Sequence, residues 1–315
     1  MTSTRRALVA AWCAAVIVAG VAMVALALVL GRGAPPPAPP GLADTARVPA
    51  WMGAITSFLV VLVGVATVGF GLLASGLLDR PRPAMRAVAA GAAGWWAALT
   101  IFQFGLLSSE LRGSVDVLDT ARARALLLQL VLALVAALGW WLGRLRSVAL
   151  LAMTCSLAAL LPSVIAGHPR ATDHPVVAAL SVSAHVVGAA VWVGGLAAIA
   201  WLAAIGDGGW GDALPRYSRL ALACVVVLTL AGGLTSILRL NSITELWSSR
   251  YGAIVTFKVV LLVGLAVAGW LQRRYVFVGT PMLRRHFLII AALELTTMTM
   301  ALALAAALER TPPPV

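Results

Sequence analysis

The chain has 315 residues, of which 62% are hydrophobic and 11% are charged. Soluble domains carry roughly 25% charged residues, so this composition excludes an ordinary soluble protein and indicates a polytopic membrane protein. The net charge of +12 comes from basic residues scattered at the ends of apolar runs rather than gathered on one face, a distribution that argues against a nucleic-acid-binding surface.

Apolar stretches long enough to cross a lipid bilayer recur along the whole chain. A hydrocarbon core of about 30 Å needs roughly 20 helical residues, and the alternating pattern of a membrane β-barrel is not present. We therefore predict an all-α bundle of about nine transmembrane helices. Their predicted ranges are 7–30, 51–78, 84–107, 122–143, 147–167, 176–204, 217–239, 252–271 and 286–308.

The first predicted helix follows Arg5 and Arg6 and so resembles a secretion signal. Its apolar run continues from Ala7 to Leu30, whereas a signal core is about 7–15 residues long, so we expect an uncleaved membrane anchor. The proline-rich stretch 33–40 that follows predicts an extended external linker.

The distribution of arginine favours one orientation in the membrane. Cytoplasmic loops carry an excess of basic residues. If the N-terminus is cytoplasmic, more arginines fall on the cytoplasmic side than on the external side, and most acidic residues fall on the external side. We expect the N-terminus to be cytoplasmic and the C-terminus to be external.

The three cysteines, Cys13, Cys155 and Cys224, lie in three different predicted helices and form no CxxC pair. This spacing argues against a disulfide framework. We interpret them as small packing residues; the alternative, a thiolate relay for a metal, would require three helices to bring them together.

A short loop after the fifth predicted helix, GHPRATDHP at 167–175, is rich in histidine. Imidazole binds late first-row transition metals well, and the prolines in the loop restrict its backbone. We predict that His168, Asp173 and His174 form an external capture site for a metal ion. The alternative is an ordinary polar turn in which His168 only caps a helix end.

The next predicted helix carries His185, about 13 Å from its external end. An ionisable side chain inside a bilayer is costly and needs a partner or a function, so we predict that His185 is an intramembrane metal ligand. Gly188 and Trp192 share its face, and the nearby glycines predict close packing of another helix. The alternative is a structural histidine bonded to a backbone carbonyl.

The last predicted helix carries Glu294 and Met298, which are one turn apart and share a face. Met298 lies roughly 15 Å from the external end of its helix, at a depth similar to that of His185. Thioether sulfur selects Cu(I), and Glu294 would balance its charge or accept a proton. We predict a copper site of His185, Met298 and Glu294. The alternative is that Met298 only fills space in the apolar core.

Lys258 is the single lysine of the chain and lies inside the eighth predicted helix. By helical rise it is about 12 Å nearer the external end than Glu294. We therefore expect Lys258 to reach outward or to form a hydrogen bond near the external entrance rather than to pair directly with Glu294.

Residues 150–312 resemble the CopD family of copper-resistance and copper-uptake membrane proteins. The similar pieces are GH at 167–168, AHVVGAAVWVGG at 184–195, RYSRLAL at 216–222, LWSSRYGAIVTFK at 246–258, QRR at 272–274 and the last helix with its glutamate. We therefore divide the chain into 1–145, four membrane helices that match the family only in hydropathy, and 146–315, five CopD-like membrane helices.

The resemblance implies movement of copper, as Cu⁺ or Cu²⁺, across the bacterial cytoplasmic membrane by a multi-pass protein. Transport in this family is commonly inward and often involves a periplasmic CopC-like copper carrier, which here would be a separate chain. Family histidines carry over to His168 and His185, whereas His174 has no clear counterpart. Because the RTPPP tail of related proteins leads into a cytochrome oxidase assembly domain, the resemblance also implies an oxidase assembly factor as a partner.

Two other classes of function remain open at this stage. A haem-binding electron-transfer protein would use His185 and a second imidazole at similar depth as axial ligands. A scaffold for assembly of a respiratory oxidase would move no ion at all. We expect no enzyme activity and no ATP-driven step, because the sequence has no nucleophile–base motif, metalloprotease motif or nucleotide-binding loop.

Overall fold

The computed structural model describes residues 3–30, 47–78, 80–111, 116–166, 174–237, 250–277 and 284–308. Over these residues the regular structure is helical, without a strand, and nine helical spans are long and apolar enough to cross a membrane. The prediction of an all-α membrane bundle is confirmed, while its orientation in the membrane stays a prediction. The helices are α1 (Ser3–Leu30), α2 (Arg47–Ala74), α3 (Pro83–Glu110), α4 (Ala121–Leu142), α5 (Arg146–Ala158), α6 (Pro162–Ile165), α7 (Pro175–Ile205), α8 (Trp210–Ile237), α10 (Arg250–Phe277) and α11 (Arg284–Leu308), with a 3₁₀ turn, η1 (Val117–Asp119), before α4.

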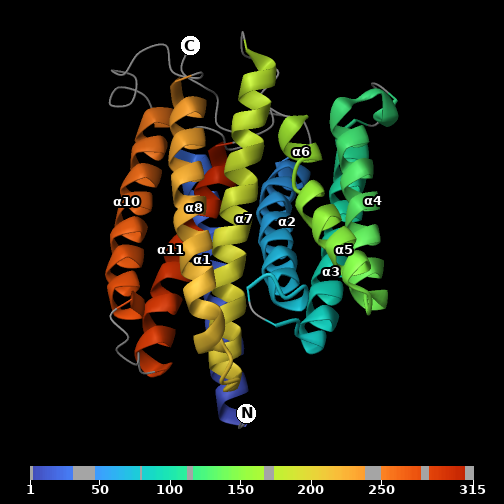
Figure 1. Cartoon of the computed structure of the whole chain (residues 1–315). Helices are drawn as coiled ribbons and strands as arrows, with labels where there is room; N and C mark the ends of the chain where they lie inside the picture. Colours follow the sequence, from blue (N-terminus) through green and yellow to red (C-terminus); the bar gives the residue numbers. More distant parts are fainter. Residues whose placement is uncertain are drawn as a thin grey trace.

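Helix α1 begins at one end of the bundle and α11 finishes at the opposite end (Figure 1). We call the end where α1 begins the N-end and the opposite end the C-end. Helix α7 begins at the C-end and finishes at the N-end, whereas α11 runs the other way (Figure 1). On the predicted orientation, the N-end is cytoplasmic.

Among the helix boundaries that differ from the predicted ones, three have a cause in backbone chemistry. Helix α2 ends at Ala74 rather than at 78, because Gly76 adopts a left-handed conformation with φ 77° that closes the helix. The fifth span is broken between Ala158 and Pro162, where proline supplies no amide hydrogen to continue the helix.

The third difference concerns α8, which starts at Trp210 instead of 217 and contains Pro215. A proline near the start of a helix removes only one backbone hydrogen bond, so the helix continues through it.

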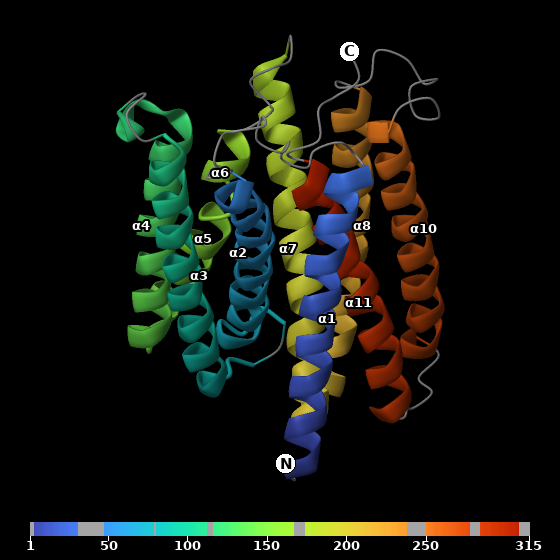
Figure 2. The same cartoon turned by 180° about the vertical axis from the view of Figure 1, so that it is seen from behind.

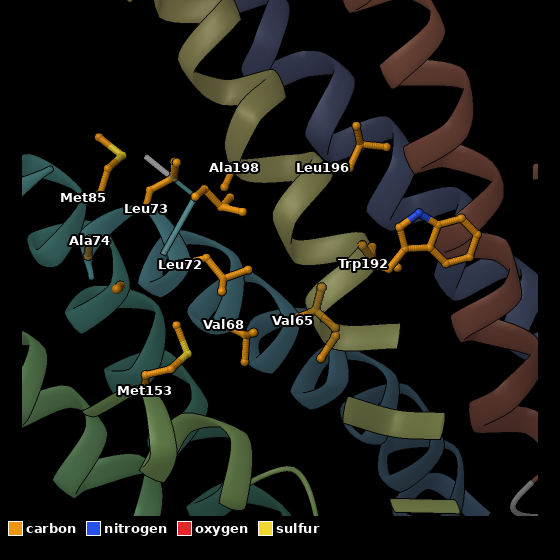
Figure 3. Close-up of a cluster of buried hydrophobic side chains, with 14 of the residues drawn as sticks. Val65, Val68, Leu72, Leu73, Ala74, Met85, Met153, Trp192, Leu196 and Ala198 are labelled. Atoms are coloured by element: carbon orange, nitrogen blue, oxygen red, sulfur yellow. The ribbon is translucent and has the colours of Figure 1, made fainter. Parts of the chain in front are cut away.

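Helix α2 lies between α3 on one side and α7 on the other. Val65, Val68 and Leu72 of α2 and Ala198 of α7 belong to the main hydrophobic core, where the two helices meet (Figure 3). The closest approach is at two glycines: a Cβ atom added to Gly69 would lie 2.0 Å from the carbonyl oxygen of Gly194. The α2–α7 contact is therefore backbone against backbone.

Helices α2 to α6, which we call the frame, are joined by hydrogen bonds between buried or half-buried side chains. The Gln129 amide of α4 donates to the hydroxyl of Thr100 in α3 at 2.9 Å and its Oε1 accepts from Ser163 of α6 at 2.7 Å. The Gln103 amide of α3 donates to Ser57 of α2 at 3.0 Å. These contacts hold four helices of the frame together.

Helices α7, α8, α10 and α11 form the second region, which we call the C-terminal bundle. Helix α8 packs along α7, and α11 contacts both α7 and α10. Helix α1, from the opposite end of the sequence, packs against α11 (Figure 2). The C-terminal bundle contains His185, Met298 and Glu294, and α7 connects it to the frame.

Candidate functional site

A direct contact at the N-end sets a common height for the two helices that carry the predicted metal ligands. Arg284, at the start of α11, donates to the carbonyl oxygens of Ala203 and Ala204 at the end of α7. Counted from this level by helical rise, Glu294 lies about 15 Å into the bundle, Met298 about 21 Å and His185 about 27 Å. The three predicted ligands thus follow one another in height at intervals of about 6 Å.

His185 faces α8. A Cβ atom added to Gly232 of α8 would lie 3.5 Å from Cε1 and Nδ1 of the imidazole, so the glycine leaves room for the ring. One turn nearer the C-end, the Ser181 hydroxyl contacts Thr235 at 3.0 Å and donates to the carbonyl oxygen of Ala231 at 2.8 Å. A polar strip therefore follows the α7–α8 contact.

The imidazole of His185 is only partly satisfied. The backbone of Leu228 lies close enough to act on the ring. The buried Nδ1 has no hydrogen-bond partner. An unpaired imidazole nitrogen is chemically able to bind a late transition metal. The charge of Lys258 on α10 also acts on His185.

The shared face predicted for α7 is present in part. A Cβ atom on Gly188 would lie 3.5 Å from Leu228 of α8 and one on Gly195 would lie 2.6 Å from the Tyr217 ring of α8, so both glycines face α8 as His185 does. Gly194 lies on a different face, against α2. Two helices, rather than the single predicted one, pack closely against this glycine-rich segment.

Glu294 is 8% exposed, and its Oε1 has no hydrogen-bond partner. Gln272 of α10 is close enough to act on the carboxyl group, although its own buried Nε2 also completes no hydrogen bond by geometry. Tyr217 of α8 is the second neighbour, since the charge of Glu294 acts on it. The Tyr217 hydroxyl donates to the carbonyl oxygen of Trp192 at 2.8 Å and so links α8 to α7 beside the glutamate.

Met298 is 2% exposed and belongs to the main hydrophobic core. Glu294 and Met298 are both buried, as their predicted common face requires, whereas Met300 is only half-buried. The indole of Trp192 points away from α2 (Figure 3). The thioether of Met298 is therefore shielded from lipid at a height between His185 and Glu294.

Of the three residues of the predicted external capture site, the structure describes His174. His174 is exposed at the N-cap position of α7, without a side-chain capping bond, about 16 Å from His185 along the helix. His168 and Asp173 lie outside the described residues. The capture site thus stays a prediction.

Among the described residues, no group of three or more His, Cys, Asp and Glu side chains lies close enough to hold one metal ion. Cys13, Cys155 and Cys224 therefore do not come together at one position among the described residues. Cys155 and Cys224 are buried, as packing residues should be, whereas Cys13 is exposed on α1.

Two neighbours of the site had no predicted role. Tyr217 and Gln272 lie in the segments RYSRLAL and QRR, whose resemblance to the CopD family implies no role for either residue. The signal that could have found Gln272 is its position, since an amide near the end of an apolar helix has few partners. The predicted helix begins at Tyr217, two residues after Pro215, whereas α8 begins at Trp210. Tyr217 therefore lies inside the helix rather than at its end.

Residues 211–308 match the family model described as Copper resistance protein D. This match supports membership of the CopD family. The matched CopD segment contains Tyr217, Gln272, Glu294 and Met298 but not His185 or the histidine loop. No curated protein and no solved structure matches the chain. The match associates this segment with copper resistance or transport, and the nine helical spans among the described residues agree with a multi-pass membrane protein.

Proposed function

We propose that this protein carries copper inward across the bacterial cytoplasmic membrane, with His185, Met298 and Glu294 as successive steps. The observation that carries the proposal is a pair of buried polar atoms, Nδ1 of His185 and Oε1 of Glu294, that both lack a hydrogen-bond partner. They lie on the C-terminal bundle at heights on either side of Met298.

Such atoms are unfavourable unless they serve a ligand. Leaving a buried donor or acceptor unpaired costs about 1–3 kcal/mol, and ionisable groups within a membrane span commonly mark ion pathways. A cation that passes between the two heights would satisfy each atom in turn. The unpaired atoms are therefore better explained by a transient ion than by packing.

The chemistry of the three side chains suits a soft cation. Imidazole nitrogen and thioether sulfur bind Cu(I), and the carboxylate of Glu294 would neutralise the positive charge deep in the bundle. Because successive ligands differ by about 6 Å in height, an ion would pass from one to the next rather than rest in one closed site. An inside-negative membrane potential of 100 mV favours inward movement of one positive charge by about 2.3 kcal/mol.

We extend the proposal to the ends of the route and to partners. His168, Asp173 and His174 would receive copper at the external face, from a periplasmic CopC-like carrier on a separate chain. An oxidase assembly factor is the proposed recipient on the other side. The protein would perform no catalytic step.

Copper accumulation in proteoliposomes tests the route. His185→Ala and Met298→Leu should each lower the initial rate at least about tenfold, as expected for loss of a metal ligand. His286→Ala and Met300→Leu are the matched controls, since His286 is exposed at the start of α11 and Met300 is only half-buried; both should transport like the wild type.

Equal rates in His185→Ala and the wild type, at equal amounts of inserted protein, would contradict the route. A wild type that moves no copper, in cells whose oxidase fails to assemble when the gene is deleted, would instead favour the scaffold.

A further inference from the structure

The turn between α7 and α8 is held at the N-end of the bundle by two arginines from elsewhere in the chain. Helix α7 closes at Gly206, which has a left-handed φ of 84°. Its amide bonds back to Ala203 at 3.2 Å, and α8 begins four residues later at Trp210. The short turn 206–209 therefore joins the helix that carries His185 to the helix that lines its polar strip.

Arg82, in the connection between α2 and α3, binds this turn from the side of the frame. Its Nη1 forms an ion pair with Oδ2 of Asp207 at 2.7 Å, and its Nη2 donates to the carbonyl oxygen of Gly209 at 3.1 Å. The Arg82 amide donates to Leu73 at 3.1 Å, so the arginine is itself fixed to the end of α2. A Cβ atom at position 209 would lie 2.2 Å from the guanidinium, and glycine is what allows this approach.

Arg284, at the start of α11, forms hydrogen bonds on the other side of the turn. Its Nη2 donates to the carbonyl oxygen of Ala204 at 2.8 Å, and its Nε donates to Ala203. The rings of Trp210 and Phe287 stack beside it with centroids 4.8 Å apart. The start of α11, which carries Met298 and Glu294 further along, is thus attached to the same turn.

These contacts close the N-end of the region that contains the buried ligands. Ala203, Ala213 and Phe287 are fully buried there, on the three helices that lead from Glu294 toward the N-end. An ion that has reached Glu294 meets this packed layer next.

We propose that Arg82 and Arg284 form a latch on the α7–α8 turn, and that copper leaves at the N-end only when the Arg82–Asp207 pair opens. The inference rests on the proposed function, because the ion that must pass the closed end is the copper carried by His185, Met298 and Glu294.

The pair is suited to open and close. The Asp207 side chain is 35% exposed while that of Arg82 is 9% exposed, so water can replace the arginine at the carboxylate, and a pair of this exposure is a weak contact. Gly206, Gly208 and Gly209 surround Asp207 and give the turn backbone freedom. An ion pair to a fully buried aspartate would instead stay closed, because water could not replace the arginine.

Thiol accessibility measures the opening without any copper. In full-length protein in detergent, with Cys13, Cys155 and Cys224 replaced by alanine, Ala213→Cys places a thiol under the latch. A water-soluble maleimide should label it slowly, and Asp207→Asn should raise the labelling rate by roughly fivefold, the effect of losing one partly exposed ion pair. Asp212→Asn is the matched control, an exposed carboxylate in the first turn of α8, and should leave the rate unchanged.

Equal labelling in the presence and absence of the Asp207→Asn change would overturn the latch. If Ala213→Cys does not fold, Ala204→Cys, half-buried at the end of α7, reports the same opening.

Cross-linking then connects the latch to transport. Arg82→Cys and Asp207→Cys, tethered by a reducible bifunctional thiol reagent, should lose copper flux in proteoliposomes and regain it on reduction. Flux in the tethered protein equal to that in the reduced protein would overturn the gating role. Absence of flux in the untethered wild type would overturn the proposed function, while the labelling result would still report whether the turn opens.

Discussion

The frame and the C-terminal bundle differ in how completely their buried polar and ionisable side chains are hydrogen-bonded. In the frame, Gln129 is 2% exposed and its amide is bonded on both sides, to Thr100 and Ser163. In the C-terminal bundle, His185 and Glu294 each keep a buried atom without a partner. The polar groups of the frame hold helices together, whereas two ionisable groups of the C-terminal bundle keep the unpaired atoms on which the proposed route depends.

One group departs from this division. Trp96 of the frame, 1% exposed, has an indole nitrogen without a partner. It carries no charge and is a weak ligand for metal ions, so it does not give the frame a metal site. The comparison therefore depends on what the unpaired groups can bind as well as on their number.

The helices around the two kinds of group also differ. Helices α2 and α7 are mostly covered by protein, whereas α8 and α10 expose most of their spans. Peripheral helices with few buried contacts move at lower cost than central ones. The unpaired groups of the C-terminal bundle thus lie next to the helices that are easiest to displace.

The largest effect is expected where the two regions touch. Gly194→Ala would put a methyl group 2.3 Å from the carbonyl oxygen of Val65, a clash with backbone that only a shift of α2 or α7 can relieve. We expect a loss of stability of about 3 kcal/mol, measured as a lower melting temperature in detergent and less folded protein in the membrane.

Gly264→Ala on α10 is the matched control for this change. No atom lies within 4 Å of a Cβ added there, so the substitution should be neutral or slightly stabilising. A Gly194→Ala protein as stable as Gly264→Ala would show that the α2–α7 contact is looser than the described backbone.

An exchange of polar groups sharpens the comparison at intermediate magnitude. Gln129→Leu removes two interhelical hydrogen bonds and should lower stability by about 1–2 kcal/mol, with unchanged copper flux per folded molecule. Glu294→Gln should lower flux about tenfold without loss of stability, because it removes a buried carboxyl group that has an unpaired oxygen. If Gln129→Leu lost copper flux and Glu294→Gln lost stability, the roles assigned to the frame and the C-terminal bundle would be wrong.

The smallest effect concerns pH at the α7–α8 turn. The Gly209 amide and then the Arg82 guanidinium hold the pKa of Asp207 below its usual 3.8, against the opposing effect of partial burial. A folded pKa below the unfolded one means that the ionised carboxylate stabilises the closed turn. This contribution is complete above the unfolded value and is lost as pH falls through the folded value.

Labelling of Ala213→Cys, corrected for the reactivity of free thiol, should therefore stay constant between about pH 8 and pH 5 and increase only under stronger acid. A change near neutral pH would mean that a group other than Asp207 controls the turn.

Several features of the site followed from residue spacing alone. The interval between Glu294 and Met298 is one helical turn, so their common buried face could be predicted from the helix period. The same period placed Gly188 beside His185. The heights were harder, because depth counted from each helix end assumes that all helices end at one level, whereas Figure 1 shows α7 rising above its neighbours at the C-end.

The contacts made by side chains from distant segments could not be predicted. Arg82 and Asp207 are far apart in sequence, and nothing local to either residue specifies the other. Tyr217 and Gln272 lie near Glu294 because α10 packs against α11, while α8 packs against α7 and α10. Such neighbours depend on helix rotation and register, which a single hydropathy pattern leaves undetermined.

By itself the sequence determined the membrane-spanning helices, their apolar length and the faces on which the imidazole, thioether and carboxyl groups lie, because these follow from composition and from a fixed helical period. Only the tertiary structure decided which helices meet, how Arg284 aligns α7 with α11, and which buried polar atoms are left without partners. The physical reason is that hydrogen bonding across helices is settled by packing between segments, and packing is a property of the whole bundle.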